Sequence, residues 1–348
     1  MTSVALMDGA DPLAKARLHT LLRFGVGISA SFVMGEAFGW IPSFLAAMFT
    51  AVLLANLPVS PPVKVGLVLM AVTGLSAGYA FLVSTLLHGT PTVLVCVIGI
   101  TVFGALHTMA KGKAALPMTL LLLCISTVPV VAMVAPAYAG VLPTALTRGM
   151  VVAMLTVWLV HALWPAVLPP VPPPPPASHA APWKMALLGC AIIMPLILLY
   201  LLFGLTDAMP VLITTVLLVA TFEVEHGAVM GMTRVLGNLF GGFMGLAAYA
   251  LLGVEPSLIV LGLLVFLIAM LTGPHVFRGG TTGATALMTC NSAILVLGLA
   301  ILQPNSSAGL WGTRLLLFSL AWLFAVGMMV LFLPGRSPRP TSTGGSGY

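Results

Sequence analysis

Charged side chains are scarce in this sequence. Of its 348 residues, 60% are hydrophobic and only 6% are charged, whereas a soluble globular domain carries about 25% charged residues. This composition excludes an ordinary water-soluble fold. The 13 Lys and Arg outnumber the 7 Asp and Glu, but in a membrane protein such a basic surplus first encodes orientation, so we expect no nucleic-acid partner.

Sequence signals for enzymes, metals and nucleotides are also missing. The cysteines lie far apart inside apolar runs, with no C-x-x-C pair, and therefore predict neither a disulfide nor a metal site. The sequence contains no G-x-x-x-x-G-K-[ST] or H-E-x-x-H motif. We expect no catalytic residue, no metal and no cofactor, and we expect any energy coupling to use an ion gradient rather than ATP.

What the sequence does have is a series of long apolar segments separated by turn residues. A membrane-spanning helix needs about 20 apolar residues, and the segments at 42–57 and 210–222 are short by this measure. The sequence predicts an all-α integral membrane protein of about twelve transmembrane helices. They lie near residues 21–40, 42–57, 65–87, 91–109, 116–135, 143–165, 185–204, 210–222, 228–252, 257–272, 283–302 and 310–333.

The two halves of the chain resemble each other. Cys124-Ile125-Ser126 is echoed by Cys290-Asn291-Ser292, and Thr147-Arg148 by Thr313-Arg314, both at an offset of 166 residues. A proline-rich stretch lies where the two copies would join, and such a stretch forms an extended spacer. This pattern predicts two parallel six-helix repeats that pack as separate bundles.

The predicted organisation has five parts. They are an N-terminal tail over 1–19, a first repeat over 20–165, a linker over 166–183, a second repeat over 184–333 and a C-terminal tail over 334–348. Lys and Arg concentrate at alternate turns, and the intervening turns contain none. By the positive-inside rule, both tails and the linker are predicted to be cytoplasmic.

Two cations break the orientation pattern. Arg148 and Arg314 lie at equivalent positions of the repeat, one or two turns inside the external ends of their helices. An intramembrane arginine is costly and normally faces protein or a water-filled cavity. One interpretation is that both guanidiniums attract a substrate carboxylate. The other is that they reach the external surface, or pair with an acid such as Glu36.

Uncharged polar residues at mid-membrane depth are further candidates for substrate binding. Ser126 and Thr127 belong to the first copy, and Thr289, Asn291 and Ser292 belong to the second. Their side chains could line a transport route. They could equally bond to neighbouring helices or to carbonyls of their own helix, which is common for Ser and Thr in membrane spans.

Proton coupling requires groups that titrate within the membrane. The candidates are Glu36, Asp207, His107 and His161. Each has a simpler interpretation: Glu36 as an arginine partner, Asp207 as a turn residue, and the histidines as interfacial residues.

Glycines predict where helices approach closely. Gly74 and Gly78 form one small-x-x-x-small pattern, and Gly237, Gly241 and Gly245 form another at the equivalent place in the second half. Such patterns allow two helix backbones to come close.

Several short motifs resemble the fusaric acid resistance superfamily, in particular its compact membrane-only branch. These are Leu22-Arg23-Phe24, Gly35-Glu36-Ala37-Phe38-Gly39-Trp40, Leu53-Leu54-Ala55, Pro61-Pro62 and Thr147-Arg148. The resemblance implies an exporter of the aromatic acid exporter class in the bacterial inner membrane. Plant aluminium-activated malate transporters are distantly similar, and that likeness implies an arginine-lined anion path.

The function expected from this resemblance is proton-coupled export of small organic anions, chiefly aromatic carboxylates. Its partners would be the anion, the lipid bilayer, a periplasmic adaptor protein and further copies of the chain. Two alternatives stay open at this point: a passive anion channel built on the same path, and a non-transporting scaffold that docks the adaptor.

Overall fold

The computed structural model describes the backbone of residues 12–113, 115–134, 136, 139–166, 181–204, 216 and 224–302. It describes their side chains too, except those of residues 12, 115, 116 and 224–235. The predicted linker, the predicted eighth and twelfth segments and both tails lie largely or wholly outside these ranges. Arg314 and Asp207 are among the residues outside them.

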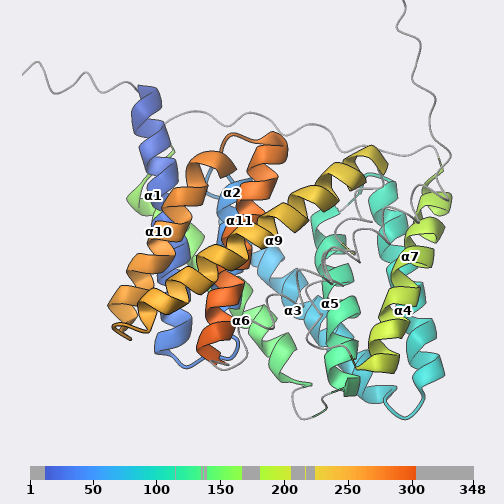
Figure 1. Ribbon diagram of the computed structural model, residues 1–348. Helices are drawn as coiled ribbons and strands as arrows, with labels where there is room; N and C mark the ends of the chain where they lie inside the picture. Colours follow the sequence, from blue (N-terminus) through green and yellow to red (C-terminus); the bar gives the residue numbers. More distant parts are fainter. Residues whose placement is uncertain are drawn as a thin grey trace, which may run out of the picture.

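The described part of the chain is all-helical and contains ten helices, labelled as in Figure 1. They are α1 (Pro12–Ala37), α2 (Phe44–Asn56), α3 (Val63–Leu86), α4 (Pro91–Ala110), α5 (Ala115–Val134), α6 (Val141–Leu163), α7 (Pro182–Phe203), α9 (Val224–Leu252), α10 (Leu258–Val276) and α11 (Gly280–Leu302).

Eight of these helices are long and apolar enough to cross a membrane, while α2 and residues 236–252 of α9 form shorter apolar helices. Leu75, Ile100 and Leu202 are among many large apolar side chains exposed on the helix surfaces, as is expected where helices face lipid. The predicted all-α membrane class is confirmed. The count of twelve spans stays a prediction.

Local sequence sets several helix ends. Proline occupies the first turn of α4 and of α7, where its fixed φ suits a helix and its missing N–H costs nothing. Gly204 ends α7 with a φ of 62°, a left-handed conformation that glycine adopts readily. Ser257 precedes α10, and its hydroxyl accepts a hydrogen bond from the Val260 N–H at 3.2 Å.

The helices enclose two apolar cores that do not coincide with the two predicted repeats. One core is formed mainly by α3, α4, α5 and α7, and includes Ile125, Ile193 and Tyr200. The other is formed mainly by α1, α2, α6, α10 and α11, and includes Phe24 and Ile294. Each core combines helices from before and after the linker, so the expectation of two separately packed bundles is wrong.

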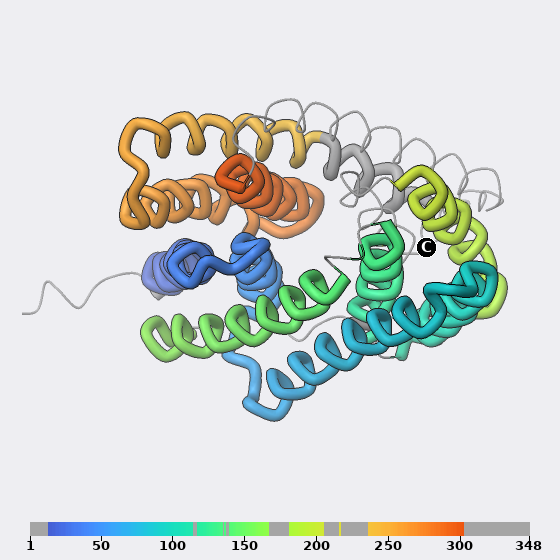
Figure 2. Tube along the Cα trace, turned by 90° about the horizontal axis from the view of Figure 1, so that it is seen from below, coloured from blue at the N-terminus to red at the C-terminus, as the bar shows by residue number. Residues whose placement is uncertain are grey.

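The contacts across the halves are reciprocal. Helix α1 packs on α10 of the second half, and α7 packs on α4 of the first half, at opposite sides of the molecule (Figure 1). Helices α3 and α5 pack together, as do their predicted counterparts α9 and α11. Seen from below, the first of these cross-half pairs lies beside α2, and the second lies beside α5 (Figure 2). Among the described helices these contacts agree with the predicted repeat, which stays a prediction.

Glycines explain the close packing of α9 on α11. A Cβ atom at Gly237 would lie 2.6 Å from the Cβ of Met288, and one at Gly245 would lie 2.7 Å from the Ala293 carbonyl oxygen. At Gly241 it would collide with the Thr289 carbonyl. In α3, Gly74 only touches Thr147, and Gly78 has nothing within 4 Å. The predicted close contact is therefore present in α9 but not at Gly78.

Matched alanine substitutions in these two helices would test this difference. Gly241→Ala should lower the stability of the protein by about 1–3 kcal/mol, because the new methyl group overpacks a backbone contact. Gly78→Ala gives the same gain in helix propensity without a clash, so its melting temperature in detergent should stay equal or rise. Equal melting temperatures for both variants would contradict the contact.

Candidate functional site

Helices α1, α2 and α6 pack against one another and carry polar residues along their shared faces. We call these faces the α1–α2–α6 seam. The α1 residues that face the seam recur at every fourth position, which puts them on one face of the helix. They are Arg23, Gly27, Ser31 and Gly35. The end of the seam near Ala37 is the predicted external end, and the end near Arg23 is the predicted cytoplasmic end.

Arg148 of α6 lies at the external end of the seam. Its guanidinium carbon is 4.5 Å from the centre of the Trp40 ring, a distance typical of a cation–π interaction. Phe38 stacks on Trp40 at 5.3 Å between ring centres. Within the described ranges Arg148 has no hydrogen bond or ion pair, so its planar donors stay available.

Glu36, a proton-coupling candidate, also lies at this end. It accepts a hydrogen bond from the Ser43 hydroxyl, and Gly35 makes this approach possible, because a Cβ there would lie 2.6 Å from the Ser43 carbonyl oxygen. Glu36 forms no ion pair with Arg148 within the described structure. The geometry therefore does not support Glu36 as the partner of Arg148.

The middle of the seam contains a cluster of three buried hydroxyl groups. Ser31 Oγ lies 2.8 Å from Thr50 Oγ1 and 3.2 Å from Thr156 Oγ1, so one residue comes from each of α1, α2 and α6. Ser31 and Thr50 are fully buried, and Thr156 is nearly so. This hydroxyl cluster gives the apolar centre of the seam a set of hydrogen-bonding atoms.

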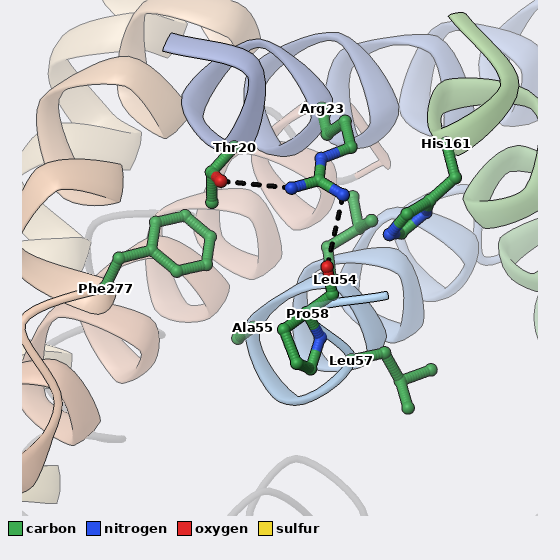
Figure 3. A pocket seen from close by; sticks show the side chains of 8 residues that line it. All are labelled: Thr20, Arg23, Leu54, Ala55, Leu57, Pro58, His161 and Phe277. Atoms are coloured by element: carbon green, nitrogen blue, oxygen red, sulfur yellow. Dashed lines mark hydrogen bonds between the residues drawn. The ribbon is translucent and has the colours of Figure 1, made fainter. Parts of the chain in front are cut away.

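Arg23 lies at the cytoplasmic end of the seam, beside a cavity of about 90 Å³ (Figure 3). Its side chain is 5% exposed. Nη1 donates to the Pro58 carbonyl at 3.2 Å, and Nη2 donates to the Thr20 hydroxyl at 3.0 Å. No carboxylate of the described chain pairs with it.

His161 of α6 lines the same cavity, with its ring beside the Arg23 guanidinium (Figure 3). Nδ1 hydrogen-bonds to the Val157 carbonyl at 2.8 Å, while Nε2 is buried and has no hydrogen-bond partner among the described atoms. Only 5% of the residue is exposed, so the imidazole faces protein atoms, in the last turn of α6.

The polar candidates of α5 and α11 are mostly satisfied within the protein. Ser126 donates to the Leu122 carbonyl at 2.6 Å, Thr127 to Leu123 at 2.7 Å and Thr289 to Thr285 at 2.9 Å. Ser292 donates to the Asn238 carbonyl of α9 at 3.4 Å. Asn291 differs from them, because its buried Oδ1 has no partner in the described region.

The structure does not bring all predicted site residues together. His107 belongs to α4, where it stacks on Phe103 at 5.9 Å and keeps a buried Nδ1 without a described partner. It lies away from the seam. Arg314 and Asp207 are outside the described ranges, so their relation to Arg148 is a prediction only.

Sequence reasoning missed the Arg23 cavity and the hydroxyl cluster. Arg23 agreed with the positive-inside pattern and needed no further explanation on sequence grounds. The four-residue spacing of Arg23, Gly27, Ser31 and Gly35 was the available signal, since polar and small residues on one helix face predict a helix contact rather than lipid.

The comparison with known families concerns this same part of the chain. Residues 20–160 match the family described as Protein of unknown function (DUF2955), which belongs to the FUSC-like membrane protein group. No curated protein and no solved structure matches the chain. The match includes Arg23, the hydroxyl cluster and Arg148. The α1 to α6 region of this multi-pass membrane protein therefore resembles a FUSC-like family.

Proposed function

We propose that this protein is a secondary transporter of the bacterial inner membrane that exports small organic anions, chiefly aromatic carboxylates, in a proton-coupled manner. The observation that carries the proposal is the contact of Arg148 with the Trp40 ring, on which the exposed Phe38 stacks, and with no carboxylate in the described chain. A cation that lacks an acidic partner attracts an anion, and Phe38 and Trp40 offer flat apolar surface beside it.

The rest of the seam supports a route between the two membrane faces. Arg23 and Glu36 are separated by about 20 Å along α1, at 1.5 Å per residue, and the hydroxyl cluster lies between them. An anion moving along the seam would meet donors at both ends and in the middle. Hydrogen-bond donors reduce the large cost of a carboxylate in an apolar medium.

The second half is proposed to supply a related set of groups. The reciprocal packing of α1 on α10 and α7 on α4 supports an internal duplication, and duplication would place Arg314 as the partner of Arg148. Asn291 has a buried acceptor without a partner in the described region, and it is the best supported of the α5 and α11 candidates for contact with a substrate.

Transport by the purified protein in vesicles would test the proposal. A panel of aromatic and aliphatic carboxylates should give saturable flux that rises with an imposed pH gradient and stops with an uncoupler. Currents that need no gradient coupling would instead indicate a passive anion channel. An absence of flux, together with stable co-purification of a periplasmic adaptor, would indicate a scaffold.

A further inference from the structure

Arg23 and His161 form a second polar site, at the opposite end of the seam from Arg148. We propose that their cavity binds the carboxylate group of a small acid together with one proton. This inference deepens the proposed function by naming a cytoplasmic site for the anion and its coupled proton. It concerns binding, so it can be tested without transport.

Arg23 is a buried cation with unused hydrogen-bond donors in the described structure. Its guanidinium carries five N–H donors, and within the described ranges it makes two hydrogen bonds to protein, to Pro58 and Thr20. Burying a cation without an anionic partner is unfavourable, and no described carboxylate pairs with Arg23. An anion in the cavity would accept hydrogen bonds from the remaining N–H groups of Arg23 and would neutralise its charge.

The hydrogen bond of His161 to Val157 fixes the tautomer of the neutral ring. A carbonyl oxygen only accepts hydrogen bonds, so the contact with Val157 requires the ring proton on Nδ1. Nε2 of the neutral ring is then a bare lone pair, buried beside the cavity. A carboxylate alone would be repelled by this nitrogen. A carboxylate that arrives with a proton would share the proton with Nε2 through one oxygen and accept from Arg23 through the other.

Arg23 and His161 are the ionisable groups that line the cavity among the described residues. Helix α1 contributes Thr20 and Arg23, α6 contributes His161, and the remaining surface is provided by Leu54, Ala55, Leu57, Pro58 and Phe277. At the same end, His19 lies near the Pro165 carbonyl at 3.1 Å, and His275 and Arg278 are exposed; none of these three lines the cavity. The volume of about 90 Å³ exceeds what one water needs and accommodates a carboxyl group.

Calorimetric titration with benzoate would test the site, using the full-length protein in detergent. An Arg148→Gln background removes the external site, so that the remaining binding reports on the cavity. At pH 7.5, in two buffers of different ionisation enthalpy, binding should take up about one proton per benzoate, because a free carboxylate is ionised at this pH. Binding without proton uptake would overturn the proposal.

Variants at the cavity then assign the two roles. Arg23→Gln should weaken benzoate binding at least about tenfold, since it removes charged donors. His161→Asn keeps an N–H near the Val157 carbonyl and removes Nε2, so proton uptake should disappear. Arg17→Gln is the matched control, because it removes an exposed cation from the same helix, and it should change neither quantity. Unchanged proton uptake in His161→Asn would contradict the role of the imidazole.

Two further measurements keep the test decisive. If Arg23→Gln does not purify as a single species, Arg23→Lys preserves the charge but loses the planar donors, and it should also bind more weakly. If Asp8→Asn/Asp11→Asn raises benzoate affinity, a carboxylate of the chain itself fills the site, which would overturn the proposal. Loss of export with intact proton-linked binding would count against the proposed transport function alone.

Discussion

Replacing Arg148 by glutamine should nearly abolish export of aromatic carboxylates while the protein still inserts and purifies normally. Glutamine keeps much of the side-chain volume and loses the charge, so the effect reports on attraction of the anion. Hydrogen bonds to charged groups are worth about 1.5–3 kcal/mol, which corresponds to a fall in the initial rate of roughly 10- to 100-fold. Counterflow of labelled benzoate in vesicles would measure it.

The controls for Arg148 separate charge from structure. Arg148→Lys retains the cation but loses the planar donors and the fit to the Trp40 ring, so its rate should lie between those of the wild type and Arg148→Gln. Arg314→Gln should lower export to a similar extent if the second half supplies an equivalent cation. Normal transport by both glutamine variants would contradict the proposal that these arginines attract the transported anion.

The fold class was predictable from the sequence because membrane helices leave a strong local signal. Apolar runs of sufficient length, ended by glycine or proline, predict helices directly, as the end of α7 at Gly204 illustrates. The packing of the helices was not predictable in the same way. The pairing of α1 with α10 and of α7 with α4 joins segments far apart in the chain, and apolar surfaces of similar composition do not specify which neighbour they contact.

The candidate site also has parts that the sequence predicts and parts that depend on helix packing. Arg148 was identifiable because a cation at the external end breaks the positive-inside pattern, whereas Arg23 conforms to it. The hydroxyl cluster takes one residue from each of three helices, and Ser31, Thr50 and Thr156 are individually unremarkable in a membrane span. These three residues form a cluster only because α1, α2 and α6 pack against one another. Similarly, Gly78 and Gly241 look alike in sequence, and only the neighbouring helix distinguishes them.

The hydroxyl cluster leads to the second large expected effect. The triple variant Ser31→Ala/Thr50→Val/Thr156→Val should export benzoate at least about tenfold more slowly than the wild type, since a carboxylate crossing the centre of the seam would lose its hydrogen-bond donors. Stability should change little, because the three hydroxyls become apolar together and none of them is left unpaired. The remaining partner is the Ala46 carbonyl, which accepts from Thr50 at 2.8 Å and lies inside helix α2. Thermal unfolding in detergent and vesicle flux would measure the two quantities.

A matched triple variant in α3 shows whether the loss belongs to the route rather than to buried hydroxyls in general. Thr73, Ser76 and Ser84 are buried to a similar degree, and the Thr73 and Ser84 hydroxyls bond to carbonyls of their own helix. Thr73→Val/Ser76→Ala/Ser84→Ala should therefore leave flux near the wild-type rate. If both triple variants transport equally well, the anion does not pass along the α1–α2–α6 seam. Arg148 and Arg23 would then belong to two independent anion sites. Two cations at opposite ends of the seam can act in one transport cycle only when the anion can pass between them.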